Sequence, residues 1–207
     1  MQKIFLIIIL SINCYFVSNT HLLSEALSKY VDKNKGEYKK AFFAGGCFWC
    51  MEESFDKING VIKSVSGYSG GHIKNPTYKQ VVYEDTGHVE AIAVFYNPKV
   101  INYEKLLEVF WKNIDPFDAD GQFCDKGKSY RSVAFYQNLK QKKIITDSIL
   151  DIEKRFSKKK VVTLVWKFDN FYPAEDYHQN YYKNNFLRYL AYKSGCQRTE
   201  TLDKIWN

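Results

Sequence analysis

Apolar and polar positions alternate along the chain in runs that predict its strands and helices. Short apolar runs bounded by turn residues predict strands at 41–44, 61–66, 89–96, 132–136 and 161–168. The run at 89–96 is apolar at almost every position, which is typical of a strand in the middle of a sheet that is covered on both faces.

Longer segments carry apolar residues at helical spacing. They predict helices at 48–58, 103–114, 138–156 and 175–182. Strands and helices are interspersed without the strict strand-helix-strand order of a doubly wound sheet. We therefore expect an α+β fold, a two-layer α/β sandwich around a mixed sheet with a ferredoxin-like core.

The length and composition of the chain favour a single globular domain. With 207 residues, 45% hydrophobic and 17% aromatic, the chain can bury one sizeable core. The formal net charge of +7 comes from lysines that are spread along the chain and densest at 140–143 and 158–160. These lysines do not alternate with aromatic residues as in a known nucleic-acid-binding module. We therefore expect them to form a solvated surface, and we expect no nucleic-acid partner. We also expect a monomer.

The amino terminus has the pattern of a secretory signal peptide. A basic start is followed by the apolar run 4–12 and then by polar residues. This run is about half the roughly 20 residues that a spanning helix needs. We expect a signal peptide at 1–19, a linker at 20–38 and a domain at 39–207, in a protein exported to the periplasm or secreted. Membrane anchoring by the amino terminus, including lipidation of Cys14, stays open as an alternative.

Cys47 follows Gly45-Gly46, where a strand is predicted to end and a helix to begin. Free backbone N–H groups and the helix dipole stabilise negative charge at such a position, so we expect the pKa of Cys47 to fall below its usual value of about 8.5. Cys50 lies three residues on, on the same helical face. The alternative is an inert buried thiol. We favour it less, because two glycines give access to Cys47 and a second cysteine lies within reach.

Glu90 interrupts the apolar strand predicted at 89–96. A charged carboxylate without a partner would be costly there, so we expect Glu90 to be protonated or hydrogen-bonded. Loss of hydration raises a carboxyl pKa, which would let Glu90 donate a proton near neutral pH. The alternative is a carboxylate at the edge of the sheet, paired with a lysine.

Several further segments join these two residues in one pattern. In chain order they are Gly46-Cys47-Phe48-Trp49, Asn75-Pro76-Thr77-Tyr78, Thr86-Gly87-His88-Val89-Glu90-Ala91, Asp125-Lys126-Gly127 with Tyr130-Arg131-Ser132, and Phe171-Tyr172-Pro173-Ala174-Glu175-Asp176-Tyr177-His178-Gln179. Together they resemble the A-type peptide methionine sulfoxide reductases, in the same order as in that family and over residues 39 to 207. One such motif would be weak on its own, whereas chance agreement over all of them is implausible.

The resemblance implies a mechanism. The Cys47 thiolate would attack the sulfur of methionine sulfoxide, and Glu90 would give a proton to the departing oxygen. Tyr78 and Tyr130 would hold that oxygen by hydrogen bonds. Cys47 would become a sulfenic acid as methionine is released.

The same resemblance implies the substrate and its pocket. Phe48 and Trp49 would form an apolar pocket for the sulfoxide methyl group, and Asp125 would line its polar side. The family acts on the S epimer of the sulfoxide, free or within peptides and proteins, and so repairs oxidised proteins. It needs no metal and no cofactor beyond an external thiol donor.

The sulfenic acid must then be reduced, in this family by a second cysteine that passes the disulfide to thioredoxin or to an equivalent thiol such as dithiothreitol. We rank Cys196 first for this recycling role, because it lies in the segment 193–197, which has the character of a mobile tail. Cys50 is second. Cys124 stands beside Asp125, and a structural or relay role suits it better.

Other classes fit the residues less well. Cys47-x-x-Cys50 lacks the second close pair of a structural zinc site, and Met51 stands where c-type haem attachment requires a histidine. A general thiol-disulfide oxidoreductase of the thioredoxin kind is the main alternative. His178 and Asp176 do not share a helical face, so a structural hydrogen bond is the favoured role for His178.

Overall fold

The computed structural model describes residues 38–157 and 159–207. The expected signal peptide, the linker and Cys14 lie outside the described residues. Residues Lys39–Asn207 form one compact unit. Within the described part of the chain, no helix combines the length and the apolar character that a membrane span requires.

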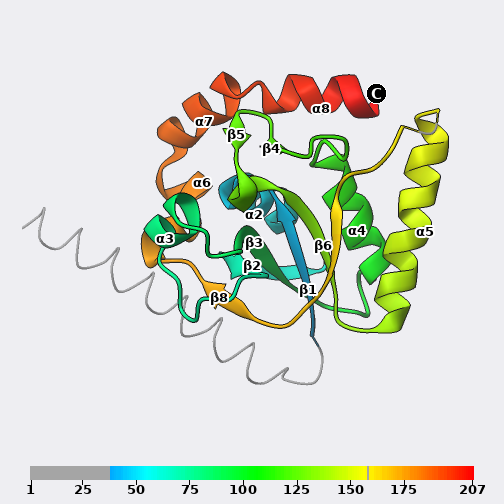
Figure 1. Ribbon diagram of the computed structural model, residues 1–207, viewed down its shortest axis with the longest axis horizontal. Coiled ribbons are helices and arrows are strands. Elements are labelled where there is room, and N and C mark those ends of the chain that lie inside the picture. The colour runs from blue at the N-terminus through cyan, green and yellow to red at the C-terminus, as the bar shows by residue number, and fades with distance from the viewer. Residues whose placement is uncertain (1–37, 158) are drawn as a thin grey trace, which may run out of the picture. The chain divides into compact units, whose positions relative to one another are not determined.

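A six-stranded mixed sheet forms the centre of this unit (Figure 1). Its spatial order is β7 (Leu164–Lys167), β6 (Ser132–Tyr136), β1 (Lys39–Gly45), β3 (Val89–Tyr96), β2 (Val61–Ser69) and β8 (Phe171–Pro173). Neighbouring strands are antiparallel except β6 and β7, which are parallel and joined through a helix. The strand predicted at 89–96 is β3, and it lies between β1 and β2 as expected for a run that is apolar on both faces.

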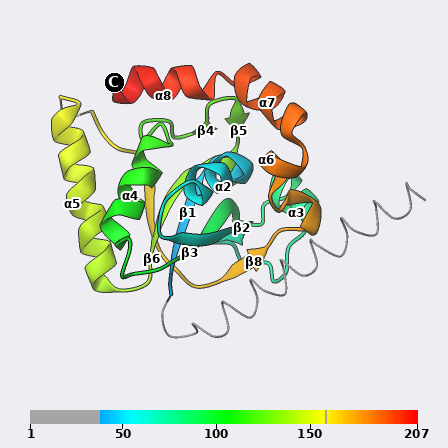
Figure 2. The ribbon, with the colours of Figure 1, turned by 180° about the vertical axis from the view of Figure 1, so that it is seen from behind.

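Helices α2 (Phe48–Asp56), α4 (Tyr103–Lys112) and α5 (Leu139–Arg155) pack together with one face of the sheet. Figure 2 shows α2 lying over the strands, with α4 and α5 beside it. The inward positions of α4, among them Leu106, Leu107 and Phe110, are buried. A second apolar cluster, which includes Phe42 and Ala91, is covered by side chains from the segment that carries β7 and β8. The mixed, curled sheet with its helices confirms the predicted α+β fold.

The single helix predicted at 175–182 is wrong. The chain forms a 3-10 turn at Asp176–His178 and a separate short helix α6 (Tyr181–Asn184). Asn180 divides them, because it adopts a left-handed backbone conformation with φ 52°, which asparagine tolerates better than most residues. Its N–H donates to Oε1 of the buried Glu52 at 3.0 Å, so a tertiary contact decides where the helix breaks.

The mobile tail expected around Cys196 is also wrong. Helix α7 (Phe186–Gly195) and helix α8 (Arg198–Trp206) flank it, and Cys196 caps the carboxyl end of α7. The Trp206 indole N–H donates to the Ile114 carbonyl at 3.1 Å, which fastens the end of α8 to the domain. The large apolar residues Phe186, Leu187 and Leu190 of α7 face solvent, and α8 has few apolar residues, so hydrophobic spacing gave no indication of these helices.

Candidate active site

Cys47 lies at the turn that joins β1 to α2, as predicted, and it is the residue that precedes the first turn of the helix. The turn depends on its two glycines. A Cβ on Gly45 would lie 2.6 Å from Sδ of Met51, and a Cβ on Gly46 would lie 2.6 Å from Cβ of Gln122. Gly46 also has a φ of +74°, which side-chain-bearing residues rarely adopt. The close packing leaves Cys47 with 5% of its surface exposed.

The expectation of a lowered pKa for Cys47 is wrong. Burial raises the pKa of the Cys47 thiol, and its hydrogen bond to Cys50 raises it further. The backbone N–H of Phe48, which could have stabilised the Cys47 thiolate, donates instead to Glu90 at 3.0 Å. The hydrogen bond between the two thiols, by contrast, lowers the pKa of Cys50. The two sulfurs therefore form a hydrogen-bonded pair in which Cys50 is the first to lose its proton.

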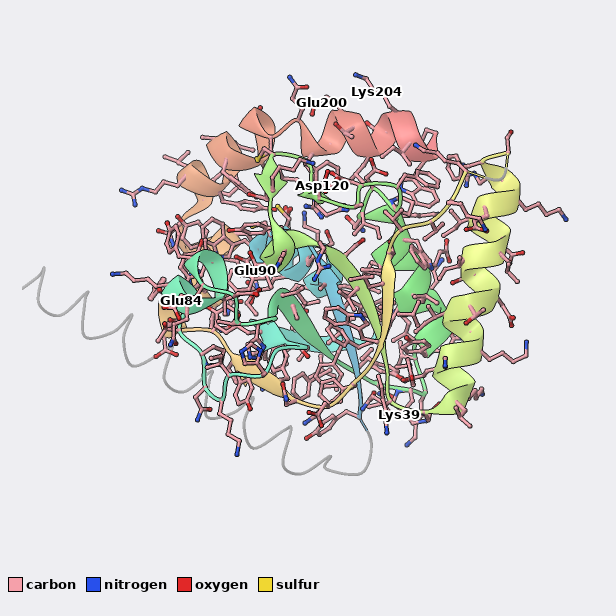
Figure 3. The ribbon with its side chains drawn as sticks, viewed as in Figure 1. Lys39, Glu84, Glu90, Asp120, Glu200 and Lys204 are labelled. Carbon is pink, nitrogen blue, oxygen red and sulfur yellow. A yellow bond between two sulfur atoms is a disulfide. The ribbon has the colours of Figure 1, made fainter. Side chains whose placement is uncertain are left out.

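Glu90 lies near the start of β3, a central strand of the sheet, where it pairs with Tyr68 of β2, and it is 2% exposed. This position excludes the alternative of a carboxylate at the sheet edge. Burial raises the pKa of Glu90 to about 8, despite the hydrogen bond from Phe48, and the charge of Asp125 acts in the same direction. Figure 3 shows Glu90 within the packed side chains of the interior. Glu90 is therefore largely protonated at neutral pH, as a proton donor must be.

Tyr78 and Tyr130 reach the same place from separate elements. Tyr78 begins helix α3 (Tyr78–Tyr83), which the sequence prediction missed although Thr77 and Gln80 form a capping box there. Tyr130 ends a 3-10 turn at Lys128–Tyr130. The two hydroxyls are hydrogen-bonded to each other, and burial raises the pKa of Tyr78 to about 12. Burial raises the pKa of Tyr130 as well, so both remain hydroxyl donors at neutral pH.

Asp125 lies in a small hairpin of β4 (Gly121–Gln122) and β5 (Asp125–Lys126). Burial raises the pKa of its carboxyl group. Tyr192, from α7, donates a hydrogen bond from its hydroxyl to this carboxyl. The sequence analysis did not single out Tyr192, since one more tyrosine in an aromatic-rich segment carries no distinguishing pattern.

These side chains enclose a cavity of about 100 Å³. It is lined by Cys47, Phe48, Trp49, Tyr78, Glu90, Asp125, Tyr130 and Tyr192. Every residue predicted for the substrate step thus meets at one small cavity, although the residues come from elements far apart in the chain. Its volume suits a group of a few heavy atoms rather than a large ligand.

Trp49 is held in place from both sides. Its indole N–H donates to Nδ1 of His178 at 3.2 Å, and the Tyr181 ring stacks on it at a centroid distance of 3.7 Å. Burial lowers the pKa of His178, which keeps the imidazole neutral and able to accept this bond. The structural role predicted for His178 is confirmed.

The remaining cysteines form a second pair. Cys124 and Cys196 are joined by a disulfide with a Cα–Cα distance of 5.0 Å. Cys124 is exposed and adjoins Asp125, so the disulfide lies next to the cavity wall but opens to solvent. Cys47 and Cys50 are both buried thiols. The structure therefore separates a buried dithiol from an accessible disulfide.

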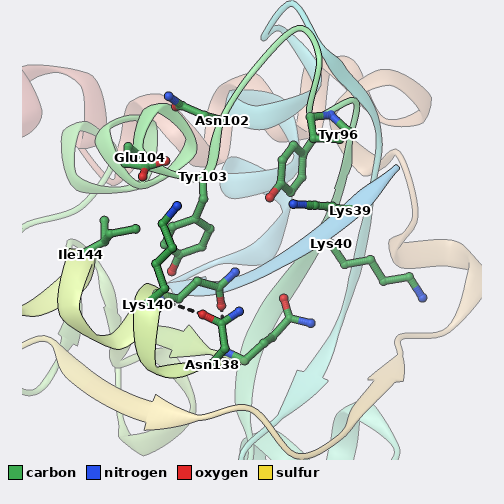
Figure 4. Close-up of a pocket in the computed structure, with 12 residues that line it drawn as sticks. Lys39, Lys40, Tyr96, Asn102, Tyr103, Glu104, Asn138, Lys140 and Ile144 are labelled. Atoms are coloured by element: carbon green, nitrogen blue, oxygen red, sulfur yellow. Dashed lines mark hydrogen bonds between the residues drawn. The ribbon is translucent and has the colours of Figure 1, made fainter. Parts of the chain in front are cut away.

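A second hollow, of about 440 Å³, lies elsewhere on the unit (Figure 4). Lys39, Lys140 and Tyr96 are among its lining residues, together with Asn102 and Asn138. The two asparagine side chains already cap helices α4 and α5. No cysteine lines this hollow, so thiol chemistry belongs to the smaller cavity.

A buried pair of thiols, of which Cys47 lines a small cavity beside a protonated carboxyl group, is typical of a thiol-dependent oxidoreductase. Comparison with known proteins identifies the family within this class. The sequence profile of the family described as "Peptide methionine sulfoxide reductase" matches residues 39–207. The chain therefore belongs to the peptide methionine sulfoxide reductase family.

Individual relatives agree with this placement. The chain is 51% identical over 174 residues to the peptide methionine sulfoxide reductase MsrA of Listeria monocytogenes serotype 4a, which covers 83% of this chain and 98% of the relative. It is 49% identical over 167 residues to that of Bacillus subtilis, covering 80% and 94%. Reduced Mxr1 from Saccharomyces cerevisiae superposes with a TM-score of 0.67 at 31% identity, over 72% of this chain and 86% of that one. Methionine sulfoxide reductase A of Corynebacterium diphtheriae, at 24% identity and a TM-score of 0.66 over 72% and 76%, shares the fold.

Proposed function

We propose that this enzyme reduces the S epimer of methionine sulfoxide, free and within proteins, to methionine. One observation carries the proposal: the Cys47 sulfur and the Glu90 carboxyl, whose pKa burial raises to about 8, line the same cavity of about 100 Å³. The relatives' names, which specify peptide methionine sulfoxide, support the substrate class.

In the first step, the Cys47 sulfur attacks the sulfoxide sulfur. As the new S–S bond forms, the Cys47 proton passes along the hydrogen bond to the Cys50 thiolate. Glu90 gives its proton to the sulfoxide oxygen, and the hydroxyls of Tyr78 and Tyr130 donate hydrogen bonds to it. The oxygen then transfers to Cys47 as a sulfenic acid, and methionine leaves. Glu90 thus supplies the proton of the sulfenic acid, and the former Cys47 proton stays on Cys50 as a thiol.

In the second step, the Cys50 thiol attacks the sulfenic sulfur of Cys47, which forms a disulfide and releases water. Reduction of the sulfoxide to methionine thus oxidises two thiols, those of Cys47 and Cys50, to a disulfide. Cys50 suits this role because it already shares a hydrogen bond with Cys47. Cys196, which the sequence analysis ranked first, is bonded to Cys124 instead.

The third step returns the enzyme to its reduced form. The Cys47–Cys50 disulfide is too deeply buried for an external protein to reach. We assign Cys124 and Cys196 to the relay: their dithiol reduces the buried disulfide by exchange and becomes the accessible disulfide that the structure contains. A thioredoxin-like dithiol or dithiothreitol then reduces that disulfide. No metal or other cofactor takes part in these steps.

The cellular setting is part of the proposal. The apolar run near the amino terminus supports export, as a periplasmic or secreted monomer that repairs oxidised proteins. Fractionation of cells that express the full chain tests this directly. Recovery of the full-length, unprocessed chain in the cytoplasm would contradict it.

Turnover of separated epimers tests the activity. With dithiothreitol, the protein is expected to convert the S epimer of a methionine sulfoxide peptide and leave the R epimer intact, and Cys47→Ser is expected to abolish conversion. Conversion of the R epimer at a comparable rate would overturn the proposal. Rapid insulin reduction without sulfoxide reduction would instead identify a general thiol-disulfide oxidoreductase.

A further inference from the structure

Arg198 is a buried cation beneath the catalytic turn. It begins helix α8 and is 3% exposed. Its Nη2 donates to the Gly45 carbonyl at 3.1 Å and to the Asn113 carbonyl at 2.6 Å, and it lies 3.4 Å from Sδ of Met51. Gly45 precedes Cys47 by two residues, and Met51 follows Cys50 directly. One guanidinium group therefore contacts the chain on both sides of the cysteine pair.

No carboxylate of the described residues is bound to this cation. Among residues 38–157 and 159–207, Arg198 forms no ion pair, and its Nη1 is buried without a hydrogen-bond partner. That nitrogen faces the Gly46 turn, since a Cβ built on Gly46 would lie 3.7 Å from it. The Phe123 ring lies 4.4 Å from the Arg198 Cζ and offsets part of the cost of burying this charge. A negative charge close by would offset more of it.

The groups around the dithiol leave few candidates for that negative charge. On the cavity side, Glu90 is neutral up to a pH of about 8. Asp125 also feels the charge of Arg198, but its carboxyl accepts a hydrogen bond from Tyr192 and is attracted by Lys126 as well. The cysteine pair is the other negative group near Arg198, and the charge of Arg198 lowers the pKa of Cys50 more than that of Lys193 does.

The second cation near the pair is already neutralised. Lys193 in α7 lies 2.6 Å from a carboxylate oxygen of Glu53, and the Tyr189 hydroxyl donates to the same oxygen. Lys193 and Tyr189 both lower the pKa of Cys50, after the larger effects of its hydrogen bond to Cys47 and of Arg198. Arg198 thus supplies the net positive charge at this site.

We propose that Arg198 is a positioning residue for the thiol chemistry: its buried guanidinium braces the Gly45 turn and balances the single negative charge that the Cys47–Cys50 pair carries in the resting enzyme. This inference rests on the proposed function in assigning the pair to catalysis. Arg198 follows Cys196 by two residues, so the same short segment carries both the counter-charge of the buried dithiol and one half of the accessible disulfide.

The proposal is tested without substrate, by titrating the protein in the form that retains the Cys124–Cys196 disulfide, so that Cys47 and Cys50 are its only free described thiols. Ultraviolet thiolate absorbance is followed against pH. Arg198→Met is expected to raise the midpoint of the first thiol ionisation by about 1 to 3 pH units, because a close opposite charge is removed. Arg198→Lys, which keeps the charge, is expected to restore most of the shift.

The matched control is Arg188→Met, at an exposed position of α7, and it is expected to leave the midpoint unchanged. Lys193→Met is expected to move the midpoint less than Arg198→Met. A folded Arg198→Met protein with the wild-type midpoint would overturn the proposal. If Arg198→Met does not fold, Arg198→Lys still tests the proposal. A folded Arg198→Lys protein whose first thiol ionises at the pH of an ordinary free cysteine would overturn the proposal too. Neither outcome depends on whether the substrate is methionine sulfoxide.

Discussion

The backbone N–H of Phe48 donates to a carboxyl oxygen of Glu90 at 3.0 Å. This contact joins the first turn of α2 to the central strand β3, and so fixes Cys47 and Glu90, the nucleophile and proton donor of the proposed mechanism, relative to each other. It also removes a backbone donor from Cys47. The local effect of a helix start on a thiol is thereby overridden by a tertiary contact. In the proposed mechanism Cys47 passes its proton to Cys50, whose pKa the charge of Arg198 helps to lower.

Replacement of Glu90 by Gln is expected to slow sulfoxide reduction by about 10² to 10⁴-fold, because a carboxamide cannot supply the proton. The substitution preserves shape and a hydrogen-bond acceptor for Phe48, so the melting temperature is expected to change little. Rapid-quench measurement of methionine released in a single turnover gives the rate. A rate equal to that of the wild type would remove Glu90 from the reaction.

The rate of the reduction step is expected to fall as the pH rises through about 8. Burial raises the pKa of Glu90 to that value, and the protonated form is the one that reacts. The pH profile of single-turnover rates measures this limb. Glu90→Gln is expected to lack it, whereas Cys50→Ser is expected to retain it. The same alkaline limb in Glu90→Gln would mean that another group titrates.

One turnover without a reductant is expected to leave a disulfide between Cys47 and Cys50. The reason is that Cys50 is hydrogen-bonded to Cys47, while Cys196 is held by Cys124. Peptide mapping by mass spectrometry identifies the bond. Cys50→Ser is expected to release one methionine, more slowly because Cys47 has lost its proton acceptor, and to accumulate a sulfenic acid that dimedone traps. A Cys47–Cys196 bond in the wild type would return the resolving role to Cys196.

Replacement of Gly46 by Ala is expected to destabilise the protein by about 1 to 3 kcal/mol. The backbone at Gly46 has a φ of +74°, and the new Cβ would meet Cβ of Gln122 at 2.6 Å. Urea unfolding measures the loss. Gly195→Ala is the matched control, since nothing lies within 4 Å of its Cβ position and its φ is not positive. Equal stability of the two variants would show that the turn is less constrained than this geometry implies.

The parts that the sequence predicted share a physical origin. Strands such as 132–136 and the helix at 103–114 are specified by the spacing of their own apolar residues, so local reasoning found them. Glu90 was found because a carboxyl group in an apolar strand is conspicuous. The resemblance to a family located the tyrosines and Asp125.

The parts that the sequence did not predict depend on distant contacts. The break at Asn180 is set by Glu52, the pKa of Cys47 by burial and Cys50, and the order around Cys196 by its bond to Cys124. Arg198 could not be predicted from the sequence for the same reason. A single arginine near the carboxyl end carries no pattern, and its importance follows only from its burial next to Gly45.

The most direct test of the account is a single turnover, with separated epimers, of the enzyme that retains its Cys124–Cys196 disulfide and has Cys47 and Cys50 reduced. Both methionine release and the intact mass of the peptide that contains Cys47 are followed. With the S epimer, we predict that each methionine released is matched by the loss of one Cys47 thiol, and that the R epimer produces neither change. Methionine released while Cys47 remains a thiol throughout would contradict the account.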